Sequence, residues 1–173
     1  MTLCTFGRVS CFEQFPELVE IVDKEWRRIS ERFPTVTTDE YVIMPNHLHG
    51  IIVIDNESGY LHGGNPKSGY PQGVSLQGNV PNNEHGPPNL GAIIGSYKSL
   101  CANAWLKLIK FRDINARGKF WQSNYYEHVI RNEEELNRIR NYIADNPLKW
   151  ESDRENPVNQ NYPVTKTQQE WMV

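Results

Sequence analysis

Residues 41–54 constrain the fold of this 173-residue chain more than any other stretch. The segment contains two apolar runs rich in β-branched residues, and Pro45 and Asn46 join them. Two such runs around a short Pro-Asn turn are typical of a β-hairpin. We therefore expect antiparallel strands over about residues 36–44 and 47–54.

The second of these strands carries His47 and His49, two positions apart. Because side chains alternate between the two faces of a strand, both imidazoles are expected on the same face. Neighbouring imidazoles can form half of a divalent metal site. Short motifs of this kind also occur where the histidines only pack, so the motif by itself leaves both interpretations open.

Apolar residues at helical spacing predict three helices. The first begins at Pro16, a position that a helix tolerates, and stops before Pro34. The second spans about residues 90–111. The third follows Asn132, a good N-cap residue, and is expected to end at Pro147.

The remaining segments suggest one domain over residues 1–150, followed by a polar tail over residues 151–173. Residues 1–15 give a poor strand signal, whereas residues 125–130 are aromatic and β-branched and predict a strand. The run from 56 to 89 is rich in Gly, Asn, Pro and Ser, which predicts a long loop inserted in the domain.

The charge distribution bears on the class of partner. A formal net charge of -3 argues mildly against a general nucleic-acid binder. However, the segment from Lys98 to Arg131 has a net charge of +5, which suits a polyanion that docks in one place. Lysines on a solvated helix face would give the same pattern, so both interpretations stay open.

The cysteine count and the hydropathy pattern indicate a compartment. The chain has three cysteines, an odd number without a Cys-x-x-Cys pair, which favours a reducing cytoplasm over a disulfide framework. No apolar run approaches the roughly 20 residues of a membrane span, and no secretory signal is visible. We therefore expect a cytoplasmic protein without a membrane partner.

Tyr142 lies near the end of the third predicted helix, and Asn146 follows four residues later. Residues four apart are neighbours on a helix surface, although a half-buried packing role is the ordinary one for a tyrosine. Four segments in order, however, make the chain resemble the REP-associated tyrosine transposase group of the single-tyrosine HUH transposases. They are YVIMPNHLHG (41–50), IIGSYKS (93–99), FWQSNYYEHVIR (120–131) and YIADNPLKW (142–150).

The resemblance implies a ferredoxin-like α+β domain, with helices packed on one face of an antiparallel sheet. It also implies that His47 and His49 bind a divalent metal, Mg or Mn, with Asn146 as a third ligand. Tyr142 would then attack a phosphodiester of single-stranded or hairpin DNA, leaving a 5′-phosphotyrosine and a free 3′-OH. A neutral phenol is a poor nucleophile without a base or metal nearby, which agrees with this arrangement.

Other residues compete for these roles. Tyr125 and Tyr126 are rivals for the nucleophile, and Tyr142 is favoured because it matches the Tyr-x-x-x-Asn-Pro segment. Aromatic residues in the 119–131 region suit base stacking and basic ones suit phosphate contacts, although core packing explains the aromatics equally well. The residues expected to contact nucleic acid are Lys98, Lys119, Trp121 and Arg131.

Three functional hypotheses remain. The first is a metal-dependent nickase and strand transferase, acting as a monomer or a homodimer. The second is a transposase-derived domain that binds nucleic acid without cutting it. The third is a zinc hydrolase that uses His47, His49 and water. Members of the group begin with a strand before the first helix. The poor strand signal over residues 1–15 predicts a sheet that lacks this strand, and loss of the strand would argue against catalytic activity.

Overall fold

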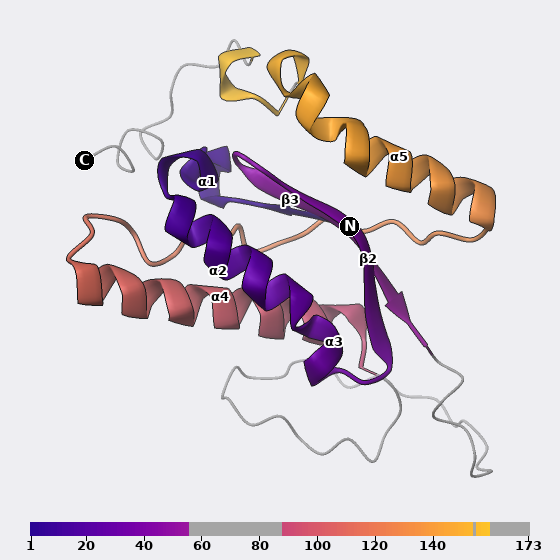
Figure 1. Cartoon of the computed structure of the whole chain (residues 1–173), viewed down its shortest axis with the longest axis horizontal. Coiled ribbons are helices and arrows are strands. Elements are labelled where there is room, and N and C mark those ends of the chain that lie inside the picture. Colours follow the sequence, from indigo (N-terminus) through magenta and orange to yellow (C-terminus); the bar gives the residue numbers. More distant parts are fainter. Residues whose placement is uncertain (56–87, 154, 160–173) are drawn as a thin grey trace.

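The computed structural model describes residues 1–55, 88–153 and 155–159 of the chain. The predicted 56–89 loop lies almost wholly outside the described residues, as does the tail from residue 160 onward. Figure 1 shows the described strands lying between α2 (Pro16–Arg27) and α4 (Leu90–Arg112) on one side and α5 (Glu133–Lys149) on the other. The α+β class with an antiparallel sheet is therefore confirmed.

The described strands form a three-stranded antiparallel sheet in the order β1-β3-β2. The predicted hairpin is confirmed, because β2 spans Val36–Met44 and β3 spans His47–Ile54. Its register shifts between Thr38 and Tyr41, where β2 is irregular. Strand β3 is central and pairs on both sides, so the backbone that carries the two histidines is held by two neighbours.

The expectation that the sheet lacks its first strand is wrong. Strand β1 (Thr2–Cys4) pairs with β3, and Leu3 is fully buried in the core. A three-residue strand is too short to show an alternating pattern, which explains the poor sequence signal. The strand predicted over residues 125–130 is reduced to an isolated bridge between Tyr126 and Thr2 on the outer side of β1.

The main core lies between the sheet and helices α2 and α4. Leu48 points into it from β3, between the buried rings of Trp26 and Tyr97 and their neighbours. The Tyr97 hydroxyl donates a hydrogen bond to the Val22 carbonyl, 3.0 Å away, which joins α4 to α2. At Gly50 the Trp26 ring packs directly on the β3 backbone, since a Cβ there would lie 2.4 Å from the ring.

Helix α5 packs against the opposite face of the sheet, so the expectation of helices on one face holds only for α2 and α4. On this second face Ile51 and Ile143 are buried. A paired hydrogen bond from Arg140 to Asp39, with Nε 3.0 Å from Oδ1 and Nη2 2.5 Å from Oδ2, joins α5 to β2. The contact with Arg140 holds the pKa of Asp39 below its usual range.

One predicted helix boundary is wrong, and one predicted helix is divided in two. Helix α5 continues through Pro147 to Lys149, because a proline in the last turn removes only one of the final backbone hydrogen bonds. The first predicted helix is broken at Arg28, whose φ of -89° and ψ of 2° separate α2 from α3 (Ile29–Arg32). The remaining short helices are η1 (Phe6–Arg8), α1 (Cys11–Gln14), η3 (Trp150–Ser152) and η4 (Pro157–Asn159).

Among the helices that the structure describes, none has the length and apolar character needed to cross a membrane.

Candidate active site

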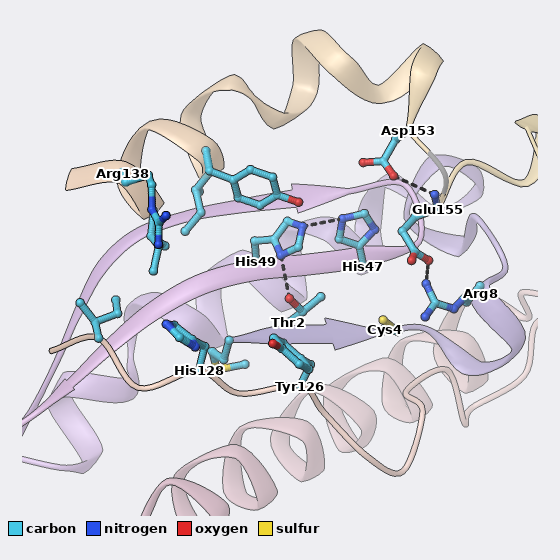
Figure 2. Close-up of a pocket in the computed structure, with 15 residues that line it drawn as sticks. Thr2, Cys4, Arg8, His47, His49, Tyr126, His128, Arg138, Asp153 and Glu155 are labelled. Atoms are coloured by element: carbon cyan, nitrogen blue, oxygen red, sulfur yellow. Dashed lines mark hydrogen bonds and ion pairs between the residues drawn. The ribbon is translucent and has the colours of Figure 1, made fainter. Parts of the chain in front are cut away.

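His47 and His49 share the face of β3 that α5 covers, as their spacing predicts. Their Nε2 atoms lie 3.1 Å apart, and the ring centroids are 4.5 Å apart. Figure 2 shows the two rings side by side above the strand, with Thr2 of β1 beneath His49. The two Nε2 atoms therefore face each other within hydrogen-bonding distance.

The other nitrogen of each ring is held by a polar side chain. His47 Nδ1 lies 2.7 Å from Asn46 Oδ1, and His49 Nδ1 lies 2.8 Å from Thr2 Oγ1. The Asn46 amide nitrogen donates to the carbonyls of Arg8, at 3.2 Å, and Glu155, at 2.7 Å, so Oδ1 is the atom that faces His47. Partners of this kind orient the imidazole ligands of metal sites.

These contacts fix the proton positions. Because an amide oxygen only accepts, His47 must donate through Nδ1, which leaves a lone pair on its Nε2. Without a cation, His49 donates through Nε2 to that lone pair and accepts at Nδ1 from Thr2. With a cation between the rings, His49 would instead donate through Nδ1 to Thr2. A hydroxyl can serve in either state because it both donates and accepts.

Burial sets the charge of the histidine pair. It lowers the pKa of His47 from 6.5 to about 4, and that of His49 to about 3, the latter also through repulsion from His47. Both rings are consequently neutral near pH 7. Neutral imidazole is the form that binds metal ions.

Tyr142 comes to this pair from α5. Its ring centroid lies 5.4 Å from that of His49, in an edge-on arrangement, and the residue is 49% exposed. One side of the phenol thus contacts the imidazole while another is open. The two segments that the sequence marked, residues 41–50 and 142–150, meet at this contact.

Asn146 lies one turn beyond Tyr142 and is only 2% exposed, yet its Oδ1 has no hydrogen-bond partner. Trp150, a further turn on, lies over His47 with a centroid distance of 6.1 Å. Asn146 is therefore bracketed by two residues of the same helical face that contact the histidine pair. A buried amide oxygen without a partner carries a large desolvation penalty, which a cation would relieve.

The donor set fits a divalent cation. Within the described ranges, no three His, Cys, Asp or Glu side chains lie close enough together to hold a metal ion. A third described ligand would therefore be of another type, and the Asn146 oxygen is available. Two imidazoles and an amide oxygen leave coordination positions open for a substrate.

A pocket of about 640 Å³ opens beside the histidines. This volume falls in the range of about 300–1,000 Å³ found for small-molecule sites. The sequence alone did not mark several residues that line it, although Tyr126 was considered as a nucleophile and stacking residue. The lining residues without a predicted role are Thr2, Arg8, His128, Arg138, Asp153 and Glu155.

The four residues predicted to contact nucleic acid do not line this pocket. Trp121 is 6% exposed and packs against Phe12, so its ring offers no free face for a base. Lys98 donates to the carbonyls of residues 122, 123 and 124 and is therefore committed to holding that segment. Lys119 lies over the Phe6 ring, and the backbone N–H of Arg131 donates to Glu135. Nucleic-acid contacts by these residues stay a prediction.

The contact of Asn46 with His47 could have been predicted from the sequence, because Asn46 directly precedes the histidine motif. The contact of Thr2 with His49 could not, since it depends on the pairing of β1 with β3.

The two rival tyrosines lie farther from the histidine pair than Tyr142 does. Tyr125 packs toward the core beneath Lys98, and Tyr126 is separated from His49 by Thr2.

No protein-family model matches the chain. An uncharacterised protein of Haemophilus influenzae is 34% identical over 153 residues, which cover 87% of this chain and 77% of that protein. A solved structure, described as a REP-associated tyrosine transposase bound to a REP hairpin, has a TM-score of 0.51 and 15% identity. That match covers 95% of this chain and 85% of the solved one. At this identity the similarity shows a related fold.

Proposed function

We propose that this chain, which belongs to the same family as the uncharacterised Haemophilus influenzae protein, is a metal-dependent nickase and strand transferase for single-stranded or hairpin DNA. The observation that carries the proposal is the contact between Tyr142 and the histidine pair. A phenol and two neutral imidazoles line one pocket, and a buried amide oxygen without a partner lies one helical turn from the phenol on α5. The related fold of a transposase solved with a REP hairpin supports DNA as the substrate.

His47, His49 and Asn146 would hold a divalent cation, and Mg or Mn is our proposal for its identity. When bound, such an ion supplies positive charge that stabilises the phosphate as negative charge builds on it. The buried Asn46 and Thr2 keep the two imidazoles in place before the substrate arrives. The site is thus organised in advance, which reduces the reorganisation needed during reaction.

Tyr142 would be the nucleophile. Its Oη would form a bond to phosphorus while the bond to the 3′ oxygen breaks, and the proton lost by the phenol would end on the released 3′-OH. The product is a 5′-phosphotyrosine, which conserves the energy of the broken ester for a later strand transfer. A position half exposed to the pocket suits this role, because the hydroxyl must reach a phosphate of a polymeric substrate.

A denaturing gel tests the proposal directly. Wild-type protein, Tyr142→Phe and the control Tyr126→Phe, which removes the hydroxyl of another pocket tyrosine, are mixed with labelled hairpin oligonucleotides in Mn or in chelator. We expect a labelled protein band in Mn for wild type and Tyr126→Phe, and none for Tyr142→Phe or in chelator.

The same gel separates the competing functions. Metal-dependent cleavage without a protein band would contradict the phosphotyrosine and indicate a hydrolase that uses water. Binding on native gels without cleavage would indicate a domain that holds DNA only. A band that persists in Tyr142→Phe would exclude Tyr142 as the nucleophile.

A further inference from the structure

We propose that Tyr126 forms a stacking surface for an unpaired base of the nucleic-acid strand that enters the pocket. This inference rests on the proposed function, because it takes single-stranded DNA as the ligand. It adds a binding residue that the metal chemistry does not require. Three independent observations carry it: the alignment of Tyr126 with His49, the exposure of its ring, and the charges that line the pocket.

The backbone places Tyr126 in line with the histidine pair. Thr2 N donates to Tyr126 O at 2.8 Å, and Tyr126 N donates to Thr2 O at 3.0 Å. Thr2 is in turn the register partner of His49. Residues directly opposite one another in an antiparallel pair point to the same face. Tyr126, Thr2 and His49 therefore form one row across the sheet, which Figure 2 shows with Thr2 in the middle.

The row of three residues fixes the distance between a base stacked on Tyr126 and the histidine pair. Two strand spacings separate Tyr126 from His49, or about 10 Å. A base on Tyr126 would consequently belong to a nucleotide close to a phosphate held at the histidines. The double hydrogen bond to Thr2 keeps the Tyr126 backbone rigid, so ordering the ring against a base loses little conformational entropy.

The ring of Tyr126 is open to the pocket that it lines. The residue is 69% exposed, whereas the adjacent Tyr125 turns the other way and packs against the core. A single exposed aromatic residue needs no explanation by itself. Its place in the wall of the pocket beside the histidines is what indicates a ligand with a flat apolar face.

The charges that line the pocket favour stacking over charge attraction. Two arginines and two carboxylates face it, namely Arg8, Arg138, Asp153 and Glu155, and Arg8 is paired with Glu155. The charges of these four side chains cancel, so they attract a phosphate only weakly while no cation is bound. A strand bound there must gain affinity from another source. Base stacking on an aromatic ring supplies it without regard to sequence.

Fluorescence anisotropy with a labelled oligo(dT) strand, in chelator so that no nicking occurs, tests the proposal. We expect Tyr126→Ala to weaken binding by about 5- to 150-fold, the loss typical of one stacked base. Tyr126→Phe and Tyr126→Trp should bind like wild type, while Tyr126→Leu should lose affinity like Tyr126→Ala. Phe111→Ala is the matched control, since Phe111 is 87% exposed at the end of α4 and does not line the pocket.

The graded series distinguishes stacking from a structural role, which would not depend on an aromatic face. The proposal is overturned if Tyr126→Ala binds the strand as tightly as wild type does, or if Tyr126→Leu binds it as tightly as Tyr126→Phe does. It is also overturned if wild type shows no measurable binding. The denaturing gel described above tests the nickase separately. If a phosphotyrosine band forms but Tyr126→Ala does not weaken binding, only the stacking proposal is rejected. If binding weakens as expected across the Tyr126 variants but no band forms, the nickase is rejected and the stacking surface is retained.

Discussion

The hydroxyl of Thr2 allows His49 Nε2 to carry either a proton or a free lone pair. Asn46 fixes the tautomer of His47 outright, because its amide is oriented by two backbone carbonyls. Thr2 can rotate its proton, and His49 can therefore present either a proton or a lone pair to His47. Metal affinity at the proposed site would consequently depend on a residue outside the proposed ligand set.

We expect Thr2→Val to weaken Mn²⁺ binding by about 10- to 100-fold, the usual effect of losing a partner to an imidazole ligand. Valine has the shape of threonine but cannot accept the Nδ1 proton of His49. Thr2→Ser keeps the hydroxyl and should restore the affinity. Isothermal titration of Mn²⁺ without DNA measures both variants. Thr2→Val with wild-type affinity would show that the His49 tautomer is not controlled by Thr2.

At the scale of elements, β3 serves two faces with opposite requirements. One face must accept the Trp26 ring at Gly50, and the other must hold the histidines under α5. Glycine meets the first requirement because any side chain there would displace a buried ring. The strand is thereby fixed against α2 while its polar face stays available.

Gly50→Ala should lower the free energy of unfolding by about 1–3 kcal/mol, the usual effect of overpacking a core. Gly95→Ala is the control, because a Cβ at Gly95 in the middle of α4 would meet nothing within 4 Å. That change should instead stabilise the protein by about 0.5–1 kcal/mol through helix propensity. Urea unfolding measures both. An equal loss in the two variants would contradict the packing argument.

The sequence predicted the elements that carry a long regular pattern, namely the hairpin, α4 and most of α5. It also marked His47, His49 and Tyr142, which the structure brings together. It missed β1 and with it Thr2, because a three-residue strand is specified by its partner and not by its own residues. The burial of Trp121 could not be predicted for a similar reason, since an aromatic turn can face the core or the solvent and only packing decides.

At the scale of the whole molecule, the buried histidines link stability to pH. Their pKa values fall on folding, from 6.5 to about 4 for His47 and about 3 for His49. Below pH 6.5 the unfolded chain binds protons that the folded chain does not. The free energy of unfolding therefore decreases as the pH falls from about 6.5 toward 4, and is fully retained above that window.

We expect a loss on the order of 4 kcal/mol between pH 7 and pH 5 in chelator, about 2 kcal/mol from each of these two groups. Urea unfolding at several pH values measures it. A His47→Gln, His49→Gln double variant should show a flatter profile over this range, since glutamine does not titrate. A wild-type profile as flat as that of the variant would show that the two histidines are not buried in the folded state.

The candidate site is assembled from parts that are far apart in the chain. Thr2 comes from its beginning, the histidines from residues 47–49, Tyr142 and Asn146 from α5, and the carbonyl that orients Asn46 from Glu155. During translation the hairpin emerges long before α5. A nascent chain therefore has no complete site until synthesis has passed residue 155.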